Sequence, residues 1–479
     1  MKHTLLFLAV CCTGFAFGQT QPYHQVHGIF PHTTVSGNLE QRSETGIGAL
    51  IPWANKLWAV GYVAHISGSG IGLYEIDENM HFKKHPESIT GTFANRMMHD
   101  PSDQAIIGPH IIDKNGVVRT WKDLGKHRLT ATMKHLTQPD SLVYFLTMEG
   151  MLFEANVFTL QSRQIFDLID EFYHTTYNEL LKKGIYIHFK GGYTGNGRVV
   201  VANNSYQNED YMGKQKGGRL AEWNGKKWTI LDSTAYVEVN GKPKAIYGNG
   251  IWAIGWDRKS VKMMFQSPDS DGWKTYRLPK GSQAWEHAWN TEWMRIREAQ
   301  TERFMVDAFG IFYEMPVMSY GGLPLPLKPV CNHLRVIPDY VSWRGFLVLA
   351  SDQGDNAVGQ PQSNFMFSHI DQLWSWGKPS GWGSVWQDEN LKEGQYSDPY
   401  LMNGFDKKVV HFSCEAGQTA SFDIEVDVLG NNQWTRYQTV STTTSGYGFH
   451  VFPEGYSAKW VRIKSLKNVK NTTVHFVYE

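Results

Sequence analysis

The sequence predicts an all-β fold, a seven-bladed β-propeller with a C-terminal β-rich extension. Short apolar runs flanked by turn residues dominate from about residue 46 onward, which is typical of strands joined by hairpins. Groups of about four such runs recur roughly every 40 to 60 residues, near the spacing of propeller blades. Helical periodicity is weak outside one segment, so the pattern favours sheets nearly throughout.

The N-terminus resembles a secretory signal. A weakly basic start precedes an apolar run, and small residues before Gln19 suit cleavage at that point. We therefore expect residues 1–18 to be a signal peptide and the mature protein to be exported, either periplasmic or secreted. Cys11 and Cys12 leave lipid anchoring as an alternative, although Val10 is a poor residue before an acylated cysteine.

The predicted propeller occupies residues 19–385. The repeat is visible in the pattern of strands and turns, and not as a repeated amino-acid motif. A large two-sheet sandwich is the competing interpretation. One helix is expected between the sheets, near Gln164 to Lys183. The blades are expected to start near Ala49, Met97, Ala131, Arg198, Ala245, Phe304 and Leu334.

From about Trp386 the sequence pattern changes to longer strands in which apolar and polar residues alternate, such as SFDIEVDVL and KWVRIKSL. Alternation with a period of two indicates strands with one buried face. Residues 386–479 are therefore expected to form either an accessory sandwich, which we favour, or the strands that close the ring.

Composition narrows the range of partners. The chain has 46 basic and 46 acidic residues, so no overall charge attracts nucleic acid or an anionic membrane. No stretch after the signal reaches the roughly 18 apolar residues that a membrane span needs. We expect no nucleic-acid or membrane partner, and a monomer. The 18 Trp, 22 Tyr and 25 Phe suit sheet packing and, where exposed, stacking on sugar rings.

Candidate site residues gather in the loops that enter the predicted innermost strands. His65 ends a second strand, His85 ends a fourth, and Asn95 and Arg96 close the loop into the next blade. The same strand phase brings further cationic side chains to this face: His127, Arg128, His188, Lys190, Arg295, Arg297 and Arg303. On a protein without net charge, such a cluster predicts a local anion site.

From this face we predict His65 and His85 as catalytic. The predicted substrate-binding residues are Asn95, Arg96, His188, Lys190, Arg297 and Arg303. A structural interpretation competes at each position, because ion pairing with nearby glutamates would equally account for the arginines. His99, His110 and His135 are assigned to structural roles.

The motifs that the sequence lacks narrow the reactions that this face could catalyse. It contains no nucleophile elbow, Walker loop, dinucleotide fingerprint or HExxH pattern. Cys331 and His333 supply two soft ligands, which is too few for a zinc site. Groups for proton transfer and charge neutralisation remain, and these fit β-elimination at a uronic acid. Histidine suits both proton roles because its ordinary pKa is about 6.5.

Several segments resemble a group of exported carbohydrate-active proteins: GIGALIPWANKLWAVGYVAH, SGIGLYEIDE, KKHPES, RIREAQTERF, PLKPVCNHLRVIPD and SDPYLMNGFDKKVVH. These are seven-bladed propeller enzymes that act at rhamnose–glucuronate linkages, and they include lyases, α-L-rhamnosidases and the related ulvan lyases. The resemblance implies that His65 and His85 are the catalytic pair, with Tyr62 or Tyr193 as an accompanying tyrosine. It implies no required cofactor, and a structural Ca or Zn ion occurs in some relatives.

Three functions follow from these observations. We expect β-elimination at a uronate in a rhamnose–glucuronate glycan such as ulvan or an arabinogalactan oligosaccharide. The product is a 4,5-unsaturated uronate, so the enzyme is a lyase, or a dehydratase where the uronate is terminal. The first alternative is an α-L-rhamnosidase, and the second is a non-catalytic propeller that binds acidic glycans.

Overall fold

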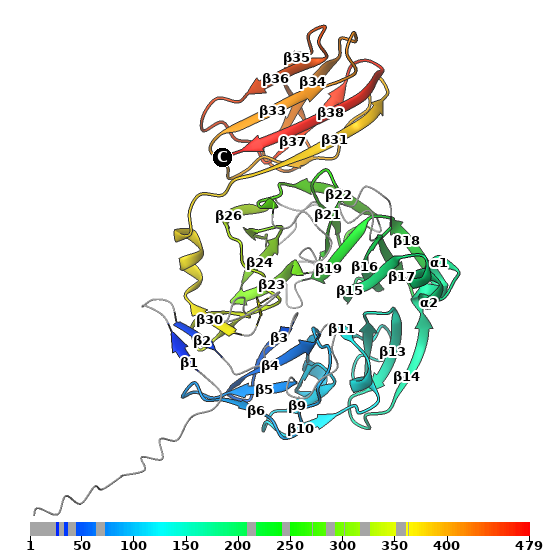
Figure 1. Cartoon of the computed structure of the whole chain (residues 1–479), viewed down its shortest axis with the longest axis vertical. Helices are drawn as coiled ribbons and strands as arrows, with labels where there is room; N and C mark the ends of the chain where they lie inside the picture. The colour runs from blue at the N-terminus through cyan, green and yellow to red at the C-terminus, as the bar shows by residue number, and fades with distance from the viewer. Residues whose placement is uncertain are drawn as a thin grey trace, which may run out of the picture.

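The computed structural model describes residues 25–27, 33–36, 45–63, 72–207, 217–241, 250–270, 272–283, 293–300, 302–316, 326–350, 361–362 and 364–479 (Figure 1). The predicted signal peptide, residues 1–18, lies outside this part of the chain. The described strands form mainly antiparallel sheets that radiate from a common centre, with a second group of strands at the carboxyl-terminal end. The fold is therefore all-β and propeller-like, as predicted.

One strand of each radiating sheet lies at the centre. These innermost strands are β3 (Thr45–Trp53), β7 (Arg96–His99), β11 (Leu129–Lys134), β15 (Ile185–Gly195), β19 (Ala235–Gly241), β23 (Arg295–Gln300) and β27 (Tyr340–Trp343). Each contacts the next in this order, and β27 also contacts β3.

The other strands of each sheet follow outward from the innermost one. From β3 come β4 (Lys56–Val63), β5 (Leu73–Ile76) and β6 (Phe82–Lys84), with β29 (Pro361–Gln362) on the opposite side of β3. From β7 come β8 (Gln104–Ile107), β9 (His110–Asp113) and β10 (Val118–Thr120). From β11 come β12 (Leu142–Thr147), β13 (Met151–Asn156) and β14 (Ser162–Asp167). From β15 come β16 (Arg198–Gln207), β17 (Arg219–Trp223) and β18 (Trp228–Asp232).

Three sheets complete this group. From β19 come β20 (Ile251–Trp256), β21 (Val261–Gln266) and β22 (Trp273–Leu278). From β23 come β24 (Arg303–Ala308), β25 (Ile311–Glu314) and β26 (Lys328–Asn332). From β27 come β28 (Phe346–Ala350), β30 (Asn364–Ser368), β2 (Thr33–Ser36) and β1 (Gln25–His27). The last sheet thus combines strands from both ends of the radiating part.

The close packing of neighbouring sheets is evident from the burial of individual strands and from one glycine. Strands β20 and β21 are buried at every position, because sheets cover both of their faces. At Gly48 the ladder between β3 and β4 shifts register, and a Cβ atom there would lie 2.0 Å from the backbone oxygen of Phe93. Only glycine permits this approach between two sheets.

The predicted blade starts agree with the innermost strands in part. Ala49, Met97 and Ala131 lie on β3, β7 and β11. Arg198 and Phe304, however, lie on the second strands β16 and β24, so those two predictions are wrong by one strand. Leu334 precedes β27, and Ala245 lies outside the described residues.

The single helix predicted near residues 164–183 is also wrong. Strand β14 continues to Asp167, whose carboxylate accepts hydrogen bonds from the backbone N–H groups of Ile169 and Asp170 and so caps α1 (Leu168–Tyr173). A left-handed residue, His174 at φ 51°, ends this helix, and Thr176 caps α2 (Tyr177–Lys182). The described 3₁₀ turns are η1 (Asp100–Ser102), η2 (Leu124–Lys126) and η5 (Ile370–Ser375). Within the described residues no helix combines the length and apolarity needed to cross a membrane.

Two further sheets form the carboxyl-terminal part. One has the order β31 (Gly381–Leu391), β38 (Val469–Tyr478), β33 (Lys408–Ser413), β36 (Tyr447–Val451). The other has the order β32 (Tyr400–Leu401), β37 (Trp460–Ser465), β34 (Ser421–Asp427), β35 (Thr435–Ser441), and β32 also joins β22 of the radiating part. Rings from the two sheets pack together, with the Tyr400 and Phe476 ring centroids 4.6 Å apart.

Candidate functional site

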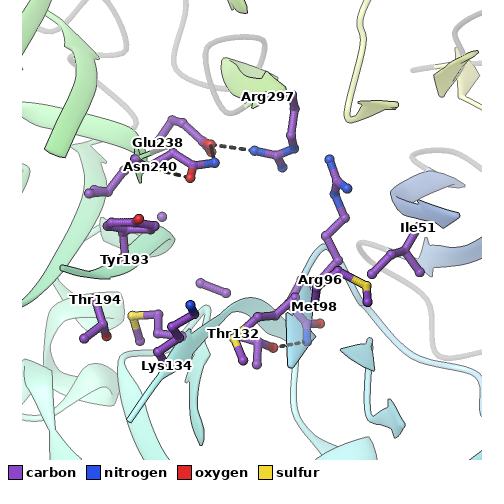
Figure 2. Close-up of a pocket in the computed structure, with 18 of the residues that line it drawn as sticks. Ile51, Arg96, Met98, Thr132, Lys134, Tyr193, Thr194, Glu238, Asn240 and Arg297 are labelled. Atoms are coloured by element: carbon purple, nitrogen blue, oxygen red, sulfur yellow. Dashed lines mark hydrogen bonds and ion pairs between the residues drawn. The ribbon is translucent and has the colours of Figure 1, made fainter. Parts of the chain in front are cut away.

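A cavity of about 600 Å³ lies among the innermost strands (Figure 2). Trp53 at the end of β3, Lys134 at the end of β11 and Thr194 near the end of β15 all line it. The lining therefore comes mainly from the middle and the carboxyl-terminal parts of these strands and from the turns that follow. The predicted site lay in the loops that enter the strands, and one such loop also contributes, through Ala94 and Asn95 before β7.

A network of ion pairs occupies one end of this cavity. Arg297 Nη1 donates to Glu238 Oε1 at 2.6 Å (Figure 2). Its Nε donates to Asp339 Oδ1, also at 2.6 Å. Arg96 Nε pairs with Asp339 Oδ2 at 2.8 Å. The Asp339 carboxylate is fully buried and also accepts a hydrogen bond from the backbone N–H of Leu50. One buried carboxylate thus ties together β3, β7 and β23 at the start of β27.

The electrostatics favour the ionised forms of Asp339 and Arg297. Burial alone would raise the pKa of Asp339, but Arg297 and Arg96 outweigh it and hold that pKa below its usual range. Burial alone would lower the pKa of Arg297, yet Asp339 and Glu238 raise it. Guanidinium groups contact both carboxylates, and Arg295 Nη1 also lies 3.9 Å from Glu238 Oε2, so the geometry of the network is fixed from several sides.

Amides extend the network along the wall of the cavity. Asn240 Nδ2 donates to the backbone oxygen of Ile296 at 2.8 Å and lies 3.4 Å from Glu238 Oε1. The buried Asn95 Nδ2 donates to Thr132 Oγ1 at 2.7 Å and to the backbone oxygen of Gly108. These contacts hold the polar side chains in single orientations.

Apolar side chains and a phenol form another part of the lining. Three thioethers, from Met97, Met98 and Met133, line the cavity together with Phe304. Burial raises the pKa of Tyr193 to about 12, so that phenol stays protonated at neutral pH. Among the described residues that line the cavity there is no histidine, cysteine or serine.

The structure brings together four of the predicted site residues. Asn95, Arg96, Lys190 and Arg297 all line the cavity. The ammonium group of Lys190 is buried and lies 5.7 Å from the ring centroid of Trp293.

The other predicted site residues lie elsewhere. His188, on β15, and Arg303, exposed at the start of β24, are not among the lining residues. His85 follows the outermost strand β6; its Nδ1 accepts a hydrogen bond from the backbone N–H of Glu87 at 3.1 Å, and burial lowers its pKa. His65 lies outside the described residues.

Sequence analysis did not select Glu238, Asn240 or Asp339. Glu238 sits in the run AYVEVNG, where a carboxylate interrupts alternating apolar residues, and Asp339 immediately precedes the strand YVSW. A charged group among buried residues requires a partner of opposite charge. On that ground the sequence could have marked both carboxylates as members of a buried ion pair.

No group of three or more metal-ligating side chains lies together in the described residues. Cys331 is buried, and His333 Nε2 lies 2.9 Å from Asp307 Oδ1. His333 therefore compensates a buried carboxylate, a role that requires no metal ion.

Comparisons with known proteins give a limited result. No protein-family model matches the chain, and no curated protein matches it. Among solved structures it is similar to the β-propeller domain of Cps50 (Swd1) from Myceliophteria thermophila, with 9% identity, 72% of this chain and 99% of that chain covered, and a TM-score of 0.38. It is also similar to U3-55K, with 8% identity, 73% and 98% covered, and a TM-score of 0.40. For the RRP9 WD40 repeats the values are 8% identity, 72% and 98% covered, and a TM-score of 0.41.

These findings contradict the relationship inferred from sequence. Of the three solved structures named above, one is described as a β-propeller domain and one as WD40 repeats, and none is described by an activity at rhamnose–glucuronate linkages. The predicted β-elimination, the rhamnosidase alternative and the acidic-glycan partner are therefore wrong. The geometry supplies a physical reason: Asp339 and Glu238 already match Arg96 and Arg297, which were expected to bind a uronate carboxylate. His85, expected to transfer protons there, lies outside the cavity lining.

Proposed function

We propose that this chain is a non-enzymatic interaction protein. In this proposal a seven-bladed propeller offers its central cavity to an extended segment of a protein partner, and the carboxyl-terminal part is an accessory sandwich. The observation that carries the proposal is the character of the lining: Arg96, Arg297 and Glu238 are ion-paired, amides and thioethers lie beside them, and the described lining residues include no histidine, cysteine or serine. Such a surface suits recognition better than catalysis.

The arrangement of the innermost strands supports the seven-bladed form. Seven of them follow one another in the described residues, each touches the next, and β27 touches β3. In addition, β2 pairs with β30, so that a strand near the N-terminus shares a sheet with the last central strand. Pairing of this kind joins the first and last blades of a propeller without leaving a long open edge.

The lining suggests the chemistry of the partner segment. Methionines adapt their shape to an inserted apolar side chain, because the thioether chain is flexible and polarizable. The turn between β7 and β8 contributes the exposed carboxylates of Asp100 and Asp103 to the lining, and Lys134 contributes one cation. An apolar residue flanked by a lysine or arginine would therefore complement both the cavity and this acidic turn.

A selection from a library of random peptides displayed on phage tests the proposal with the whole protein. We expect enrichment of peptides with an apolar residue beside a basic one, which synthetic copies labelled with a fluorophore would bind in anisotropy titrations. Met98→Asp should weaken that binding at least about tenfold, and Asp103→Lys should weaken it for basic peptides specifically. The recovered peptide should be chemically unchanged by mass spectrometry.

Val117→Asp is the matched control, because Val117 is exposed and is not among the lining residues. Circular dichroism establishes that each variant is folded. A selection with no enrichment, equal weakening by Met98→Asp and Val117→Asp, or chemical conversion of the peptide would each contradict the proposal.

A further inference from the structure

The outer face of the carboxyl-terminal sheet β31–β38–β33–β36 carries two histidines side by side. His411 on β33 and His475 on β38 lie directly opposite each other in the antiparallel ladder. Their neighbours Val410, Phe412 and Phe476 are fully buried, so the two half-buried imidazoles project from the other face of the sheet. Residues opposite each other in such a ladder have Cβ atoms about 4.5 to 5.5 Å apart. Both rings therefore lie within reach of one small ion.

A hydroxyl group on each flanking strand fixes the orientation of each ring. His475 Nδ1 lies 2.8 Å from Ser384 Oγ on β31, and His411 Nδ1 lies 2.9 Å from Tyr447 Oη on β36. The order of the strands places these two hydroxyls on opposite sides of the histidine pair. The two nitrogens of an imidazole point in nearly opposite directions. Each Nε2 is therefore directed toward the other histidine.

The two Nε2 atoms are available to a ligand. Within the part of the chain that the structure describes, no hydrogen bond joins the two rings, and neither Nε2 has a protein partner. When a hydroxyl oxygen accepts the Nδ1 proton, the neutral ring keeps a free lone pair on Nε2. In metal sites the hydrogen bond at one ring nitrogen likewise determines that the other nitrogen binds the metal. The pair has this arrangement on both sides.

The chemistry of the donors selects the class of ion. Neutral imidazole suits copper, nickel and zinc, whereas magnesium and calcium prefer oxygen ligands. No group of three or more ligating side chains lies together among the described residues, so water must fill the other positions here. Two ligands are too few for the closed tetrahedral site of structural zinc. Cu²⁺ accepts a tetragonal set of nitrogen and oxygen ligands, and it binds most tightly of the divalent first-row ions.

We propose that His411 and His475 chelate one Cu²⁺ ion through their Nε2 atoms, with water completing a tetragonal shell. Ser384 and Tyr447 are positioning residues, because they contact the ligands and not the ion. The Phe449 ring, with its centroid 6.5 Å from that of His411, adds an apolar wall on one side of the site. The site lies on the carboxyl-terminal sheet and is independent of the central cavity and of its proposed function.

Equilibrium dialysis of the full chain against Cu²⁺ tests the site by stoichiometry. Excess glycine in the buffer competes for copper held by single imidazoles. His411→Gln and His475→Gln should each retain one copper ion per chain fewer than the wild type, measured by atomic absorption. His81→Gln is the control, because the exposed His81 pairs with Asp77 and lies outside this sheet, and it should retain the wild-type content. Equal copper in the wild type and both variants, or a loss in only one of them, would overturn the inference.

Electron paramagnetic resonance identifies the ligands in the wild-type protein, whatever the variants do to folding. The bound Cu²⁺ should couple to the nitrogens of two imidazoles, and a spectrum with oxygen ligands alone or with one imidazole would overturn the proposal.

Tyr447→Phe tests the positioning role, because it keeps the ring and removes the hydroxyl. It should weaken Cu²⁺ binding by about tenfold or more, the usual cost of losing an outer partner of a ligating histidine. Ser413→Ala, a change on the same face and opposite Tyr447 in the ladder, should leave the affinity unchanged. Circular dichroism establishes that both variants are folded. Equal affinities for Tyr447→Phe and Ser413→Ala would contradict the proposed orientation of His411.

Discussion

Asp339 is the residue on which the centre of the molecule depends. Its side chain contacts groups from three other innermost strands: Leu50 on β3, Arg96 on β7 and Arg297 on β23. Two guanidinium groups share this one fully buried carboxylate, so they lose their compensation together if it is neutralised.

Asp339→Asn should therefore lower the free energy of unfolding by about 3 kcal/mol or more, the usual cost of stranding buried charges. Urea denaturation followed by tryptophan fluorescence measures the change. Asp123→Asn is the control, because Asp123 is 85% exposed and pairs with Lys126 at the surface. The control should change stability by less than about 0.5 kcal/mol, and equal effects for the two variants would contradict a structural role for the network.

His475 should make stability depend on pH. Burial, together with His411 and Lys280, lowers the pKa of His475 in the folded protein to about 4, against about 6.5 when unfolded. Folding therefore favours the neutral ring, and this contribution is complete above about pH 6.5 and is lost as the pH falls toward 4. Its size is about 3 kcal/mol.

His475→Gln should accordingly flatten the fall in stability between about pH 6.5 and about 4, measured by urea denaturation at a series of pH values. Part of the fall in stability at low pH should persist in the variant, because burial lowers the pKa of His110 to about 3. An unchanged slope in His475→Gln would show that the ring is solvated in the folded protein.

Single site residues were predictable from sequence where their position depended only on the local pattern of strands and turns. Asn95 and Arg96 begin an innermost strand, and Lys190 and Arg297 lie within two others, so their common cavity follows from the repeat of strands. Their roles did not follow, because the partners are distant in sequence: Asp339 is 243 positions from Arg96. Without that partner, the sequence left an anion-binding role and ion pairing with nearby glutamates as equal interpretations of the arginines.

At the level of elements, the segment between β14 and β15 shows why helix boundaries were missed. Its apolar residues repeat with a helical period across a break that depends on backbone geometry at His174. The caps at Asp167 and Thr176 were the visible signals, since aspartate and threonine are favoured at helix N-termini.

Asp167→Ala should lower stability by about 1 kcal/mol through loss of the α1 cap, measured by thermal or urea denaturation. Asp170→Ala removes a carboxylate from the first turn of the same helix without removing the cap and should change stability less. Indistinguishable variants would indicate that the cap contributes nothing measurable.

Strands were more predictable than their order. Runs such as IWAIGW and GRVVVANN are recognisable as strands from the sequence, and both form strands. Which run lies innermost was not evident, because β15 and β16 are both long and both contain fully buried stretches. That ambiguity moved two predicted blade starts by one strand.

At the level of the whole molecule, the radiating part and the carboxyl-terminal part share one apolar core. The Tyr276 and Trp460 ring centroids, one from each part, lie 4.6 Å apart. Arg277 is buried between the parts, bonded to Asp257 on one side and to Asp398 on the other. The boundary between them is therefore a packed interface with buried charge.

We expect the whole chain to unfold in one cooperative transition by differential scanning calorimetry, since neither part buries this surface alone. Arg277→Ala should lower the transition temperature strongly, whereas Arg258→Ala, at the rim of the same interface, should lower it little. Two well-separated transitions in the wild type would contradict this expectation.

The fold class was predictable because it depends on a repeated local pattern of strands and turns. The function was not, because it depends on side chains whose partners arrive from other blades. Matching short segments to an enzyme group supplied residue roles that these long-range ion pairs do not support.

The sheet that joins β2 to β30 also sets the order of events during synthesis. Thr33 lies opposite Phe367, so a strand that leaves the ribosome among the first waits for one of the last of the radiating part. Until β30 emerges, β2 can pair only with β1, and its backbone groups on the other side are open to pairing with other chains. Contacts between such distant segments slow folding, so that side of β2 stays open for longer than the edge of a local hairpin would.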